Sequence, residues 1–281
     1  MSRNYYCLIA GLPELQPDQN KKVFSLSEFK QELEEQLHPS DVELVKLLFL
    51  PYDNQNLLQL LQKKEIDDQL PANYTAIELK EEIREPGTLE AYLGDFITEY
   101  LTDESLAETK SVMMEQKLTE AFFQHALGCK NLFLSDWFRF DLNVKNIVTA
   151  LNCKKHNIKV EQQLIGNNEL VQTMAKSSSK DLGIAVELPE IERIAHIFES
   201  PKLLDREKLL DRFRWDWLDQ HTTFNYFSVE VVLSYVIKLT IVDRWSRLDP
   251  QTGTEMFDRL LNDIESSYQF PKEFNINEGK R

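Results

Sequence analysis

The sequence predicts an all-α protein organised as a multi-helix bundle, for three reasons. Only 8 of its 281 residues are glycine and 10 are proline, so residues that break helices are scarce. Apolar residues recur at three- and four-residue spacing along most of the chain, as they do on one face of a helix. No run alternates apolar and polar residues between hairpin turns, which is the pattern of a half-buried sheet. We expect about ten helices, joined by short loops that favour antiparallel neighbours.

The first half of the chain combines helix-start patterns with helical spacing of its apolar residues. Residues 5–12 form a short apolar element that fits either a helix or a strand. Residues 25–28 match a capping box, which indicates a helix start. Pro39 opens a second helix, which Pro51 is expected to end, and Asp53 is expected to cap a third. Further helices are expected at 89–100, 105–126 and 135–153.

The helical pattern weakens between residues 154 and 189, which contain the turn-forming run Gly166-Asn167-Asn168 and three consecutive serines. We expect one continuous domain with three parts. These are an N-terminal helical part at 1–155, connecting segments around one short helix at 156–189, and a C-terminal helical part at 190–281. Helices of the last part are expected near residue 190 and at 205–219, 227–248 and 254–268.

Charge and cysteine content limit the classes of partner and compartment. The net charge is −15 at pH 7, and nucleic acid is not an expected partner because phosphate binding needs clustered Lys and Arg. Three scattered cysteines without a C-x-x-C pair are typical of reduced thiols in the cytoplasm. The most apolar segment, 231–242, is interrupted by Lys238 and is shorter than the roughly 20 residues of a membrane span. We expect a cytoplasmic protein without a transmembrane segment.

Reactive side chains form no recognisable catalytic pattern. The chain contains no nucleotide-binding, hydrolase or metalloprotease motif. Its five histidines never fall two to a helical turn, and its cysteines are dispersed, so no metal site is indicated. We therefore expect no catalytic residue, no metal and no cofactor. An enzyme with a site that no motif reveals is the third alternative for the function.

Polar side chains flank the apolar stripe of the helix expected at 135–153. The stripe repeats at i, i+3, i+4 and i+7 from residue 144. Asp141, Asn143, Lys145 and Asn146 lie beside it. They are either surface decoration or a docking site. Our hypothesis is that they fix the helix against a neighbouring unit or line a partner surface, and any amide buried there needs satisfied hydrogen bonds.

The segment DREKLLDRFRWDWLDQH at 205–221 contains a second candidate surface. Trp and Arg dominate the energetics of protein interfaces, so Arg214 and Trp215 are candidate contacts. The alternative is that the apolar residues of this segment form a core stripe with the charges outside. We favour this alternative over an interface.

The helix expected at 227–248 is apolar almost all round, which indicates a central and mostly buried helix. Lys238 lies within it and must reach the rim, water or a carboxylate, because an unpaired buried ammonium group is costly. Tyr235 and Arg244 lie on the same helix, and with Lys238 they are candidate interface residues.

Three segments resemble known families. Asn143 and Lys145, followed by apolar residues and the basic pair at 154–155, resemble a helix in the C-type subunit of V-type ATP synthases, which is called the d-type subunit in the eukaryotic enzyme. The segment 233–248 resembles a later helix of that family, in which the residues that match are Tyr235, Lys238 and Arg244. Leu239 departs from the pattern, because the family has an acid beside the lysine. The opening NYYCLIAGLPEL looks like the start of an uncharacterised bacterial family encoded beside V-type ATPase subunits.

The resemblance to the C-type subunit implies a funnel-shaped all-α protein of three related helical units that performs no chemistry. It implies a central-stalk component of a V-type ATPase or ATP synthase, which couples ATP turnover to ion transport. The implied partners are the axle subunits and the membrane rotor ring, and the implied location is peripheral to the inner face of the membrane. The alternative function is a general helical adaptor for protein–protein interaction, unrelated to ATPases.

Overall fold

The computed structural model describes residues 3–17, 25–67, 69–102 and 111–247. These residues form eleven α-helices, one 3-10 helix and no strand, which confirms the predicted all-α fold. The helices are α1 (Tyr6–Gly11), α2 (Leu26–Gln36), α3 (Pro39–Leu61), α4 (Ala76–Arg84), α5 (Ala91–Thr102), α7 (Ser111–Leu127), α8 (Leu132–Lys155), η1 (Val160–Gln162), α9 (Glu169–Lys176), α10 (Glu190–Phe198), α11 (Leu203–Thr222) and α12 (Val229–Arg247).

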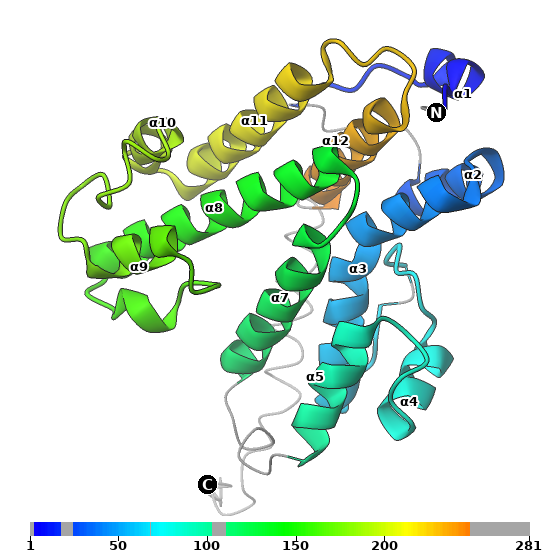
Figure 1. Cartoon of the computed structure of the whole chain (residues 1–281), viewed down its shortest axis with the longest axis horizontal. Coiled ribbons are helices and arrows are strands. Elements are labelled where there is room, and N and C mark those ends of the chain that lie inside the picture. Colours follow the sequence, from blue (N-terminus) through cyan, green and yellow to red (C-terminus); the bar gives the residue numbers. More distant parts are fainter. Residues whose placement is uncertain (1–2, 18–24, 68, 103–110, 248–281) are drawn as a thin grey trace, which may run out of the picture.

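Two arms of helices meet near α12 (Figure 1). One arm consists of α8, α9, α10 and α11, and the other of α3, α4, α5 and α7. Helix α12 packs against α11 and α8 of the first arm, against α3 of the second, and against α2. Helices α7 and α8, which follow each other in the chain, also pack together. The arms are therefore joined by direct helix–helix contacts.

One hydrophobic core extends through both arms. Its fully buried side chains include Leu57 of α3, Leu118 of α7 and Ile147 of α8. The segment 156–189, expected to connect two halves, contains η1 and α9 and contributes Ile165 to the same core. This segment is therefore packed into the body of the protein.

Helix α3 runs without interruption through Pro51, so the prediction that Pro51 ends a helix and Asp53 caps the next one is wrong. A proline inside a helix removes one backbone hydrogen bond. Pro51 is exposed, and the buried face of α3 continues on both sides of it, from Val45 to Leu57. Burial of that face outweighs the lost bond. The Asp53 carboxylate instead accepts hydrogen bonds from the backbone N–H of Asn73, at 2.8 Å, and of the next residue, at 2.9 Å.

A buried carboxylate organises the turn between α4 and α5. Glu82 is 0% exposed and accepts hydrogen bonds from the backbone N–H of Gly87, Thr88 and Leu89 at 2.6, 2.9 and 3.1 Å. Burial alone would raise the pKa of Glu82, but these bonds outweigh it and hold the pKa below its usual value. A Cβ atom at Gly94 of α5 would lie 3.2 Å from Glu82 Oε1, so this close approach favours glycine.

Helix starts follow the predictions in part. Residues 5–12 contain α1, a helix rather than a strand. Ser25 is the N-cap of α2, but its side chain makes no capping hydrogen bond, so the capping box predicted there is wrong. A capping box forms instead between Thr75 and Glu78 at the start of α4. The helix predicted at 254–268 lies outside the described residues. None of the helices that the structure describes combines the length and apolar character needed to cross a membrane.

Candidate interaction site

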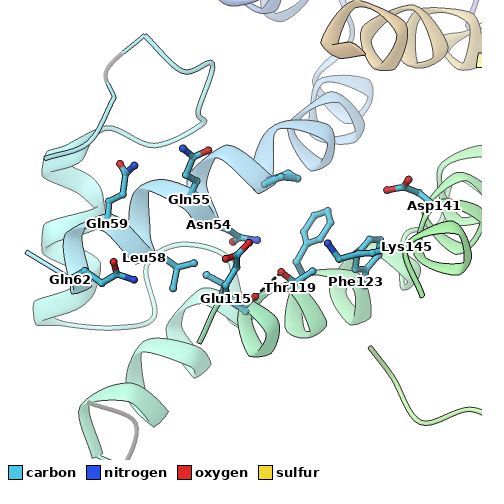
Figure 2. A pocket seen from close by; sticks show the side chains of 13 residues that line it. Asn54, Gln55, Leu58, Gln59, Gln62, Glu115, Thr119, Phe123, Asp141 and Lys145 are labelled. Carbon is cyan, nitrogen blue, oxygen red and sulfur yellow. Dashed lines mark hydrogen bonds between the residues drawn. The ribbon is translucent and has the colours of Figure 1, made fainter. Parts of the chain in front are cut away.

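A cleft of about 550 Å³ lies between α3 and α7 and reaches α8 (Figure 2). We call it the interarm cleft. It is lined by α3 between Pro51 and Gln62, by α7 between Glu115 and Phe123, and by Asp141 and Lys145 of α8. The cleft thus brings together residues from both arms.

The interarm cleft has an apolar floor and a mainly polar edge. The floor consists of buried or half-buried apolar side chains, which are Leu58, Leu118, Phe122 and Phe123. Three glutamines at i, i+4 and i+7 form a row along the end of α3 and its C-cap, at residues 55, 59 and 62. An apolar floor with a polar edge is the arrangement found where proteins bind other proteins.

Lys145 provides a positive charge at the α8 end of the cleft. Its side chain is exposed and extends from α8 toward α7 (Figure 2). No carboxylate in the described part of the chain forms an ion pair with it. The ammonium group is therefore available to an acidic group that enters the cleft.

Four charged side chains and an indole, which we call the ionic cluster, join α8, α11 and α12 beside the cleft. Arg214 Nε donates to Asp141 Oδ1 at 2.7 Å, and Arg214 Nη1 lies 3.4 Å from Asp211 Oδ1. Asp211 also pairs with Arg244 and accepts a 2.7 Å hydrogen bond from Trp245 Nε1. The Asp211 side chain is only 5% exposed, so solvent screens its pairing with Arg214 poorly. Through Asp141 of α8 and Arg244 of α12, the same cluster connects three helices.

Electrostatics keep the central arginine of this cluster charged. Burial alone would lower the pKa of Arg214, but the neighbouring charges of Asp141 and Asp211 outweigh it and raise the pKa above its ordinary value. Arg214 therefore stays charged at neutral pH, and its hydrogen bond to Asp141 fixes how α8 lies against α11.

A second hollow of about 460 Å³, the charged pocket, adjoins the interarm cleft and shares Gln55 and Asp141 with it. It also contains Tyr52 and the pair of Asp243 and Arg247, whose Oδ2 and Nε atoms lie 2.8 Å apart. Burial, with a smaller effect of the Asp243 charge, raises the pKa of Tyr52 to about 12. Tyr52 is therefore a neutral hydrogen-bonding group here at neutral pH.

The two asparagines of the predicted α8 patch have different environments. Asn146 is 1% exposed and forms a reciprocal pair of hydrogen bonds with the backbone of Ile165. Both distances, Nδ2 to the carbonyl oxygen and Oδ1 to the amide nitrogen, are 2.9 Å. Asn146 thus fixes α8 against the segment before α9. Asn143 is half-buried and lies outside the interarm cleft.

The remaining predicted residues lie within contacts between helices. Trp215 is 5% exposed and packs against Ile241 and Val242 of α12, so in this structure it belongs to the interior. Lys238 reaches a carboxylate, that of Asp219 on α11, and its ammonium group lies 5.2 Å from the centre of the Trp215 ring. Tyr235 donates a 3.0 Å hydrogen bond from its hydroxyl group to the carbonyl oxygen of Pro13.

No side chains in the described part of the chain converge in the way that metal ligands do. Among the candidate residues, the structure brings Asp141, Arg214 and Arg244 into one cluster and places Lys145 beside it. Asn146, Trp215 and the other α12 candidates lie elsewhere. The interarm cleft presents apolar side chains, amides and charged groups.

A protein-family model described as "Protein of unknown function (DUF2764)" matches residues 1–268. The chain belongs to this family. Neither a curated protein nor a solved structure matches it.

Membership of DUF2764 corrects the resemblance to the C-type subunit of V-type ATP synthases, because the matched family is an uncharacterised one and nothing in the match links it to that protein. The same applies to the family expected from the opening segment, since the description of DUF2764 carries no link to V-type ATPases. Short motifs such as Asn143 with Lys145 recur by chance in helical proteins, whereas the family match spans nearly the whole chain.

Two features of the site escaped the sequence analysis. The glutamine row on α3 has a visible helical spacing, but the break predicted at Pro51 divided that helix and hid its continuous face. Asp211 was one acidic residue among several in its segment. Nothing in the sequence indicates that it, rather than its neighbours, pairs with two arginines.

Proposed function

We propose that this protein is a non-catalytic helical subunit that holds a helical segment of a partner protein in the interarm cleft. The observation that carries the proposal is the lining of that cleft. Three helices surround an apolar floor, and at its edge stand amides, the exposed carboxylate of Glu115 and one ammonium group that has no ion-pair partner among the described residues. Grooves of this kind bind amphipathic helices, whose apolar face covers the floor while polar side chains meet the edge.

Rigid walls support this function. The ionic cluster and the continuous core oppose changes in the angle between the arms, because close-packed interiors are stiff. A partner held between such arms moves with them, so the protein would transmit position or force instead of yielding to it.

The central stalk of a V-type ATPase is the specific form of this proposal that the sequence analysis expected. In that form the partners are the axle subunits and the membrane rotor ring, and the protein lies peripheral to the inner face of the membrane. This assignment stays a prediction, and its test is copurification. Axle or ring subunits captured with the tagged full-length chain would support it, while a purified ATPase complex that lacks the chain would favour the adaptor role.

The interarm cleft itself is tested by blocking it. Gln55→Trp places a large side chain in the cleft, and Gln220→Trp makes the same change at an exposed position of α11 outside the cleft. We expect the partners captured by the wild-type chain to be lost from Gln55→Trp and retained by Gln220→Trp, with equal helical content by circular dichroism. Equal capture by both variants would overturn the proposed function.

A further inference from the structure

We propose that residues 254–268 of this chain occupy the interarm cleft as a helix when no partner is bound, and that the partner displaces them. The inference rests on the proposed function, since both concern the same cleft. These residues lie outside the described part of the chain, and three observations identify them as the occupant.

The first observation is where the described chain ends. Helix α12 ends at Arg247, whose side chain lines the charged pocket. That pocket shares Gln55 and Asp141 with the interarm cleft, so the chain leaves α12 beside the cleft. Residues 248–253 then provide a connection of up to about 20 Å when extended. This connection includes Pro250 and Gly253, residue types that favour a helix end and a turn.

The second observation is the apolar pattern of the segment. Its apolar residues fall on one helical face, and they are Met256, Phe257, Leu260, Leu261, Ile264 and Tyr268. Asn262 lies on the opposite face. A segment of this kind is stable as a helix only when its apolar face is covered, and the floor of the interarm cleft is an apolar surface of matching character.

The third observation is complementary charge and hydrogen bonding. The segment carries Asp258, Asp263 and Glu265 near its apolar face. The α8 end of the cleft presents Lys145, which has no ion-pair partner among the described residues. The carboxylate of Asp141 there is paired with Arg214, and the carboxylate of Glu115 lies on α7. Gln59 Oε1 in the cleft lining is buried and accepts no hydrogen bond from the described residues. Buried oxygens of this kind are normally satisfied, and a docked segment with polar side chains supplies donors.

Hydrogen exchange on the full-length protein tests this occupant. Ile264→Asp places a carboxylate in the middle of the apolar face, and Asn262→Asp is the matched control with the same added charge on the opposite face. We expect peptides covering 51–62 and 115–123 to exchange several-fold faster in Ile264→Asp than in wild type, because the cleft is uncovered. The control should exchange like wild type. Equal exchange in all three proteins would overturn the proposal.

Zero-length coupling of amines to carboxylates provides a second readout. We expect a crosslink within one chain between Lys145 and a carboxylate of residues 254–268, and its loss in Ile264→Asp. Crosslinks confined to a dimer would instead identify a second copy as the occupant, and absence of the crosslink from wild type would also count against the proposal.

Partner capture separates this inference from the function on which it rests. If the segment covers the cleft, Ile264→Asp should capture the partner at least as well as wild type. Suppose that Ile264→Asp exchanges faster and loses the crosslink, but that Gln55→Trp still captures the partner. The inference about the segment would then stand, and the proposed function would be overturned. Capture that depends on Gln55, with exchange unchanged by Ile264→Asp, would remove only the inference.

Discussion

The buried hydrogen bonds of Asn146 lead to the sharpest prediction of the structure. Asn146→Ala removes both bonds to Ile165 and leaves its N–H and C=O groups without partners inside the protein. Ile165 is itself 4% exposed, so bulk solvent does not reach these two groups.

The expected loss follows from these two backbone groups. Leaving a buried polar group unsatisfied costs about 1–3 kcal/mol. A water molecule that enters the space left by the truncated side chain recovers part of this cost. We therefore expect Asn146→Ala to lower the free energy of unfolding by about 3 kcal/mol. If the segment opens locally, that loss corresponds to amide exchange about a hundredfold faster at Ile165.

Asn143→Ala is the matched control on the same helix. Both changes replace asparagine by alanine within α8 and gain the same helix propensity, but Asn143 makes no hydrogen bond to the described residues. We expect it to change the free energy of unfolding by less than about 0.5 kcal/mol. Urea unfolding followed by circular dichroism measures both variants, and hydrogen exchange locates the effect. A loss below about 0.5 kcal/mol for Asn146→Ala, or an equal loss for Asn143→Ala, would refute the reasoning.

Three further variants test two buried carboxylates and one exposed helix position. Burial raises the pKa of Asp53 from its ordinary 3.8 to about 6, so the folded state holds this proton more tightly than the unfolded state does. The stabilisation by this proton is present below pH 3.8 and is lost as the pH rises through about 6. Across this window the free energy of unfolding of wild type should fall by about 3 kcal/mol relative to that of Asp53→Asn. Parallel urea-unfolding curves against pH would contradict this. Glu82→Gln should cost about 2 kcal/mol at pH 7, because one oxygen replaces two as acceptors. The cost should shrink as the pH falls below the ordinary value of 4.5, because the unfolded chain then takes up a proton that the folded state, with its lowered Glu82 pKa, still releases. An unchanged melting temperature at pH 7 would exclude that role. Pro51→Ala should raise the free energy of unfolding by about 1–3 kcal/mol, since it restores a helical N–H in exposed surroundings, and calorimetry showing a lower melting temperature would mean that α3 needs its proline.

The helical class of the fold was predictable because it follows from spacing along the chain. The stripe from residue 144 and the apolar helix at 227–248 correspond to α8 and α12 with end residues shifted by a few positions. Pro51 shows the limit of such reasoning. A local rule predicts a helix end there, but the buried face that continues to Leu57 outweighs it, and burial is a property of the folded molecule.

The candidate site was predictable only as a set of unconnected residues. Asp141 and Lys145 stand out in the sequence as polar residues beside an apolar stripe, and both line the interarm cleft. Their neighbours across the cleft come from α3 and α7, which precede them by tens of residues. Side-chain pairing such as that of Asp141 with Arg214 depends on how α8 and α11 pack, so no spacing in the sequence encodes it.

The position of α12 has a consequence for how the protein is made. This helix, which ends the described chain, packs against α2, near its beginning, and the rings of Phe29 and Tyr235 lie 5.5 Å apart. The apolar face of α2 is therefore fully covered only after α12 has left the ribosome. Contacts of such long sequence separation slow folding and leave the nascent chain open to aggregation or chaperone capture until α12 has been synthesised.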